Sequence, residues 1–175
     1  MSDAISSPSH YKQFTVEVIQ FTSLVPGDLG NSLKYVCRAG HKAGEPFEKD
    51  LAKAAVYAED FLRRHRAFSG YPMPYLHGPE AALKNYLVDL AYVCPPKVLT
   101  GMPDEKARKT RVSLEGHRNE HRYGMLESLL DVLVSLRMDG SVAIRSMFVA
   151  QFLSKLAVAK GLVDEDQPNQ DTSAY

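Results

Sequence analysis

Apolar residues recur at spacings of three and four along most of the chain, which is the period of an amphipathic helix. Alternating runs of β-branched residues bounded by turns are scarce, so strands are not expected. The pattern predicts six helices, over residues 11–24, 29–40, 46–67, 79–92, 126–138 and 141–160. We therefore expect an all-α fold, in the form of a helical bundle.

Turn-forming residues place the boundaries between these helices. Gly40 suits the left-handed position that follows a helix, and Pro46 is allowed in the first turn of the next one. Two Pro and two Gly make the segment SGYPMPYLHG the clearest internal linker. We expect four parts, namely a first helical segment, this linker, a second helical region packed on the first, and a disordered acidic tail, over residues 1–68, 69–78, 79–163 and 164–175.

The overall composition narrows the class of protein. The 175 residues suffice for a sizeable core, and 21 Lys and Arg balance 21 Asp and Glu, which argues against a protein that coats nucleic acid. No run approaches 18 consecutive apolar residues and no secretion signal opens the chain, so no membrane span is expected. Cys37 and Cys94 lack CxxC spacing, which suits a reducing cytosol.

Charge is unevenly distributed despite this balance. Residues 29–66 contain eight Lys and Arg and five acidic residues, whereas residues 97–122 contain seven and four. The last twelve residues, DEDQPNQDTSAY, contain four acids and no base. Two interpretations of residues 97–122 remain open, namely a solvated basic loop with some helix or a second phosphate-binding patch.

Functional side chains gather on two neighbouring predicted helices. Asn31, Lys34, Tyr35 and Arg38 stand at i, i+3, i+4 and i+7, and Asp50, Lys53 and Tyr57 stand at i, i+3 and i+7. These side chains can donate hydrogen bonds to phosphate oxygens and stack against a base. Facing each other across a short turn, they predict a phosphate-binding helical hairpin near the N-terminus. The other interpretation is an ordinary hairpin with exposed lysines and a structural Asp50–Arg38 pair.

Four motifs in order strengthen the first interpretation. They are Ser9-His10-Tyr11, Glu17-Val18-Ile19, the run from Gly30-Asn31 to Lys42, and Glu48-Lys49-Asp50-Leu51-x-Lys53-Ala54-x-x-Tyr57. Over about residues 8–66 the chain resembles the phage family of nucleotide kinases without a P-loop, typified by the small deoxynucleoside monophosphate kinase of T-odd coliphages. The resemblance implies phosphorylation of thymine and guanine deoxynucleoside monophosphates by a nucleoside triphosphate. It also implies a homo-oligomer, a hexamer or larger, in the cytosol of a bacterial host.

Phosphoryl transfer requires positioning and dispersed positive charge. The chain has no Gly-Lys dipeptide and therefore no P-loop, so side chains must supply that charge. We predict that Arg38 bridges donor and acceptor phosphates, and that Lys34, Lys42 and Lys53 neutralise phosphate. Asp50 is a candidate to orient a lysine, hold a metal ion or contact a sugar hydroxyl, and Asn31 is a candidate to read the base edge. Tyr35 or Tyr11 is expected to stack on the base, and Tyr57 is a further substrate-binding candidate. His10 is a candidate to contact phosphate, act as an acid or base, or accept phosphate, and the other interpretation is a helix-start residue hydrogen-bonded to the backbone.

Three questions stay open from the sequence. No metal ligands can be assigned, and the need for a divalent metal ion is not determined. A nucleotide-binding or sequestering module without turnover would use the same residues. A helical pyrophosphatase is disfavoured because the chain lacks a clustered array of acidic residues for metal.

Overall fold

The computed structural model describes residues 16–65, 73–93, 114–138 and 141–164. All regular structure within these ranges is helical, and no strand occurs in them. The elements are α1 (Ile19–Thr22), α2 (Gly27–Arg38), α3 (Phe47–His65), the 3-10 helix η3 (Pro74–Leu76), α4 (His77–Val93), α6 (Leu114–Arg137) and α7 (Val142–Asp164). The predicted all-α helical bundle is confirmed.

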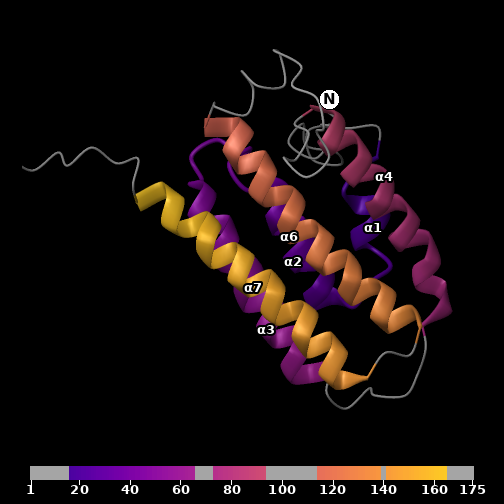
Figure 1. The fold of residues 1–175 in the computed structure, drawn as a ribbon. Coiled ribbons are helices and arrows are strands. Elements are labelled where there is room, and N and C mark those ends of the chain that lie inside the picture. Colours follow the sequence, from indigo (N-terminus) through magenta and orange to yellow (C-terminus); the bar gives the residue numbers. More distant parts are fainter. Residues whose placement is uncertain (1–15, 66–72, 94–113, 139–140, 165–175) are drawn as a thin grey trace, which may run out of the picture.

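The long helices pack side by side around a shared core. Helix α6 lies between α4 and α7, with α2 and α3 behind this layer (Figure 1). Helix α2 packs against α3, and α3 also packs against α7. Each α-helix contributes at least one fully buried side chain to one apolar cluster, for example Phe21, Leu33, Phe61, Leu83, Leu129 and Phe152.

Helix α1 approaches α2 closely at a glycine. A Cβ atom added to Gly30 would lie 2.6 Å from the backbone oxygen of Thr22 and 3.1 Å from a methyl group of Val25. Real Cβ atoms do not come this near to a backbone oxygen. Gly30 is therefore required by the packing of α1 against the start of the hairpin, whatever the hairpin binds.

We expect Gly30→Ala to destabilise the protein by about 1–3 kcal/mol, because the added methyl group must push two backbones apart. Gly27→Ala is the matched control, since a Cβ there would meet no atom within 4 Å. That variant should change the free energy of unfolding by less than about 1 kcal/mol. Urea denaturation of both variants measures the difference, and equal stabilities would contradict the close contact.

Several predicted boundaries are wrong. The segment expected as one helix over 11–24 is helical only at Ile19–Thr22 among its described residues. Here the Gln20 side chain accepts a hydrogen bond from the Glu17 N–H at 3.0 Å, which sets the helix start after Glu17. The described part of the predicted linker 69–78 contains η3 and the first turn of α4. Helix α7 also continues past residue 160, where the predicted helix ends, to Asp164.

The largest correction concerns the basic region 97–122. From Leu114 onward this region belongs to α6, which starts twelve residues before the predicted helix 126–138. Its polar residues Asn119 and Arg122 are buried rather than solvated. Both side chains form hydrogen bonds inside the protein in place of hydrogen bonds to water. A segment whose polar composition is typical of a loop therefore forms a packed helix.

Helix α7 is apolar over much of its circumference. The span Val142–Lys160 is long and apolar enough to cross a membrane by length and composition alone, and 28% of it is buried in the fold. A core helix of a soluble protein meets the same two conditions, and α7 packs against α6 and α3. The prediction that the chain does not span a membrane stays a prediction.

Candidate anion-binding site

The predicted helical hairpin is formed by α2, residues 39–46 and α3. The Ser32 hydroxyl, on α2, donates a buried hydrogen bond of 3.0 Å to the backbone oxygen of Ala54 on α3. This bond fixes how the two helices sit along each other. The connection turns through Gly40 and Gly44, with φ of +78° and +75°, and Gly40 follows the end of α2 as predicted. The facing sides of α2 and α3 thus bring the candidate residues together.

Arg38 and Asp50 form a two-bond ion pair across the hairpin. The Arg38 Nε donates to Asp50 Oδ2 at 3.0 Å, and its Nη2 donates to Oδ1 at 2.5 Å. The Asp50 side chain is fully buried and that of Arg38 is 11% exposed. Lys53 Nζ also donates to Asp50 Oδ1 at 3.4 Å. The pair that the second sequence interpretation foresaw is therefore present, and Asp50 does contact a lysine.

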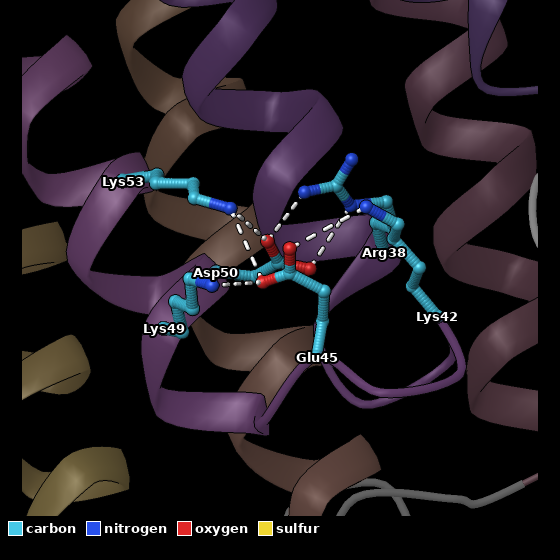
Figure 2. Close-up of polar contacts among 6 residues, drawn as sticks. All are labelled: Arg38, Lys42, Glu45, Lys49, Asp50 and Lys53. Atoms are coloured by element: carbon cyan, nitrogen blue, oxygen red, sulfur yellow. Dashed lines mark hydrogen bonds and ion pairs between the residues drawn. The ribbon is translucent and has the colours of Figure 1, made fainter.

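A second carboxylate, that of Glu45, contacts three lysines of the hairpin. Its oxygens lie 3.4 Å from Lys42 Nζ and 3.3 Å from both Lys49 Nζ and Lys53 Nζ. Figure 2 shows the Glu45 and Asp50 carboxylates side by side, with cationic groups approaching from both sides. Burial alone would raise the pKa of Glu45, but the hydrogen bonds from Lys49, Lys53 and Lys42 outweigh it and lower the pKa to about 2.

Two tyrosines lie beside these charges. The rings of Tyr35 and Tyr57 are stacked, with centroids 5.6 Å apart and an interplanar angle of 11°. Three cationic groups lie near the Tyr35 ring, with Arg38 Cζ at 4.7 Å, Lys34 Nζ at 5.1 Å and Lys53 Nζ at 5.4 Å from its centroid. A base cannot fit between the rings at this separation, so stacking on either tyrosine requires an outer face or a shift of the pair.

The structure brings most of the predicted site residues together. Lys34, Tyr35, Arg38, Lys42, Asp50, Lys53 and Tyr57 form one connected cluster through the contacts given above. Asn31 lies on α2 one turn before Tyr35 and is partly buried. His10 and Tyr11 lie outside the described residues.

The sequence pattern indicated neither the central role of Glu45 nor the participation of Lys49. Their i, i+4 spacing is a usual signal for an ion pair, although here Glu45 lies two residues before the start of α3. The pattern also did not indicate the support that α6 gives to the hairpin. Arg122 Nη2 donates to Ala39 O at 2.6 Å and its Nε to Val36 O at 3.3 Å. No local pattern connects positions more than 80 residues apart.

Arg118 and Arg122 therefore act as packing residues of the hairpin. The Arg118 guanidinium lies 5.1 Å from the centroid of the Phe47 ring, at the first residue of α3. Arg122 also donates to the side chain of Asn119, one turn earlier on α6. Of the two interpretations of residues 97–122, a solvated loop is wrong for the helical part. Arg122 is 1% exposed, so it cannot belong to a second surface patch for phosphate.

The thiol of Cys37 is buried and does not belong to the cluster. Burial raises the pKa of the Cys37 thiol to about 12, so this residue is a buried core thiol rather than a nucleophile. Within the described ranges, no three His, Cys, Asp or Glu side chains are placed to share a metal ion. The site is accordingly a set of cations and two acids around a tyrosine pair.

The comparisons with known proteins give one match. Residues 5–59 match a family described as a protein of unknown function, DUF3310, which covers 55 of the 175 residues. No curated protein and no solved structure matches the chain. The matched segment contains α1, α2 and the part of α3 that carries the site. Its description names no activity.

Proposed function

We propose that the α2–α3 hairpin binds the phosphate groups of nucleotides and that the protein is a deoxynucleoside monophosphate kinase without a P-loop. One observation carries the proposal. Four cationic side chains, Arg38, Lys42, Lys49 and Lys53, contact two carboxylates, Glu45 and Asp50. With Lys34 beside the Tyr35 ring, the five cations and two acids leave a local charge of +3. Such a surplus on one hairpin of a neutral chain suits a small anion of high charge.

The proposed reaction moves the γ-phosphoryl group of a nucleoside triphosphate to a phosphate oxygen of dTMP or dGMP, and the donor leaves as a diphosphate. The lysines would neutralise the charge on the transferred group. Arg38, held by Asp50, would be fixed in orientation beside the acceptor. The resemblance over residues 8–66 supports the substrate class, and the stacked tyrosines offer an aromatic surface near the charges.

A binding module without turnover is the second candidate function. One observation favours it, because Asp50 binds Arg38 and Glu45 binds three lysines, so acidic side chains already hold these cations in place. Such a cluster could hold a nucleotide in place of Glu45 without performing transfer. Both candidates place phosphate at the same hairpin.

The two candidates are separated by incubating the protein with dTMP or dGMP and a labelled triphosphate, with and without Mg²⁺. We expect labelled deoxynucleoside diphosphate to form. Lys34→Ala should lower the rate of transfer by about 10²–10³-fold with the fold retained, because Lys34 is outside the buried ion pair. Lys160→Ala, at an exposed position of α7, is the matched control and should not change the rate. Nucleotide binding with no diphosphate would favour the binding module.

The proposal includes self-association and a cytosolic location in a bacterial host. Ile144, Met147 and Val158 are exposed along α7, where they offer an apolar face for a second copy. A hexamer or larger assembly would have a molar mass well above the 19.5 kDa of one chain, which light scattering measures.

A further inference from the structure

Three ammonium groups converge on the single carboxylate of Glu45. The contacts measure 3.3 to 3.4 Å, whereas good charge-assisted hydrogen bonds between nitrogen and oxygen measure about 2.7–2.9 Å. Lys53 also contacts Asp50, but Asp50 is already paired with Arg38, so four cationic groups face two carboxylates. The three lysines thus have long contacts, and the cluster has a surplus of two positive charges.

A phosphate group matches the three lysines better than a carboxylate does. A phosphomonoester carries a charge of about −1.5 to −2 at neutral pH and presents three acceptor oxygens. It would offer one oxygen to each of the three ammonium groups. The flexible lysine side chains need only small movements to shorten their contacts, because none of them is fully buried.

Of the two acids in the cluster, Glu45 is the one that can leave. Asp50 is fully buried and receives two hydrogen bonds from Arg38, so its departure would break the hairpin. Glu45 lies on the connection between the helices, with its side chain 15% exposed. It follows Gly44, which has a φ of +75° and has no atom within 4 Å of the place where a Cβ would stand. The backbone next to Glu45 is therefore not packed against other atoms on this side.

We propose that Lys42, Lys49 and Lys53 form a phosphate subsite in which the Glu45 carboxylate stands in for the phosphate group until a ligand displaces it. The nucleotide nature of that ligand rests on the proposed function, but the subsite itself does not. Glu45 would keep the cationic hairpin closed in the absence of ligand and would compete with weakly bound anions. This assignment adds Lys49 as a binding residue and Glu45 as the group that a ligand must replace.

Isothermal titration with inorganic phosphate and pyrophosphate tests the subsite on the wild-type chain, Glu45→Gln and Glu48→Gln. Glu48 is the matched control, since it lies three residues later and forms no ion pair with any of the three lysines. Both substitutions raise the net charge by one. We expect Glu45→Gln to bind both anions at least about tenfold more tightly than the wild type, and Glu48→Gln to stay within about twofold.

A second substitution shows whether the gain arises at this subsite. Lys49 is 58% exposed and forms no contact with Asp50 in the structure, so Lys49→Ala should leave the fold intact, which circular dichroism checks. In the Glu45→Gln background it should cancel most of the gain. If Glu45→Gln fails to fold, Glu45→Ala replaces it in the same titrations. Equal effects of Glu45→Gln and Glu48→Gln, weaker binding by Glu45→Gln, or no anion binding by any variant would overturn the inference.

The anion titration and the transfer assay of the proposed function can fail independently of each other. Diphosphate formation by the wild type, without tighter anion binding in Glu45→Gln, would leave the kinase proposal standing and remove the subsite. Tighter phosphate binding in Glu45→Gln, without binding of any nucleotide, would do the reverse.

Discussion

Arg38→Ala should destabilise the protein by about 3–5 kcal/mol. The substitution removes both hydrogen bonds that Arg38 gives to Asp50 and leaves a fully buried carboxylate with Lys53 at 3.4 Å as its remaining contact shown in the structure. A buried charge that loses its partner retains the cost of leaving water, and this cost dominates the effect. Chemical denaturation at neutral pH measures the loss as a fall in the free energy of unfolding.

The ion pair between the exposed Arg64 and Asp28 supplies the control. Its atoms lie 3.5 Å apart and the Arg64 side chain is 68% exposed, so Arg64→Ala should cost less than about 1 kcal/mol. If Arg38→Ala cost no more than Arg64→Ala, the two-bond pair would not be a structural element of the hairpin.

A double substitution separates the structural role of Arg38 from a role in transfer. Arg38→Met with Asp50→Leu replaces the pair by apolar groups of similar size, which often restores much of the stability lost in the single variant. If Arg38 also contacts phosphate, this folded double variant should lack transfer activity. A double variant that transfers at the wild-type rate would limit Arg38 to the fold.

Arg122→Leu is the second substitution for which we expect a large loss, about 3 kcal/mol or more. Arg122 donates to the backbone oxygens of Val36 and Ala39, at the end of α2, where the carbonyl groups have no partner within the helix. Leucine would leave two buried oxygens without these donors, and each such loss costs about 1–3 kcal/mol. The loss should also loosen Arg38, which lies between the two oxygens in the chain.

The same substitution on an exposed arginine provides the comparison. Arg63 lies on α3 with 75% of its side chain exposed, and Arg63→Leu should change the stability by about 0.5 kcal/mol or less. Thermal and urea unfolding of the two variants would show the difference. Similar small changes in both would mean that Arg122 does not support the end of α2.

The class of fold could be predicted because helices follow from local patterns. Apolar spacing located α2, α3, α4 and α7 to within a few residues, and Gly40 marked the end of α2. The first half of α6 could not be found this way. Its residues are polar, and its helical state depends on the burial of Arg122 and Asn119 against distant partners. Tertiary contacts, and not local propensity, determine whether such a segment is helical.

Most members of the candidate site and the Arg38–Asp50 pair could be predicted from the sequence, but the contacts of Glu45 with three lysines could not. Helical spacing placed Lys34, Tyr35 and Arg38 on one face, and the structure joins them to Asp50 and Lys53. Which acidic side chain pairs with which basic side chain depends on the conformation of the connection between α2 and α3. Glu45 reaches three lysines because the connection curves through Gly40 and Gly44, and no helical spacing describes that curve.

The hydrogen bonds from Arg122 to the end of α2 can form only late during synthesis of the chain. The hairpin is translated early. Arg122, whose side chain donates hydrogen bonds to the last carbonyl groups of α2, is translated 83 to 86 residues after them. At about 5–20 residues per second, the ribosome needs roughly 4–17 s to cover that distance. During this interval the newly made hairpin has its charged residues but not its final support. Maturation of the site is therefore a late folding event, although its residues stand near the start of the chain.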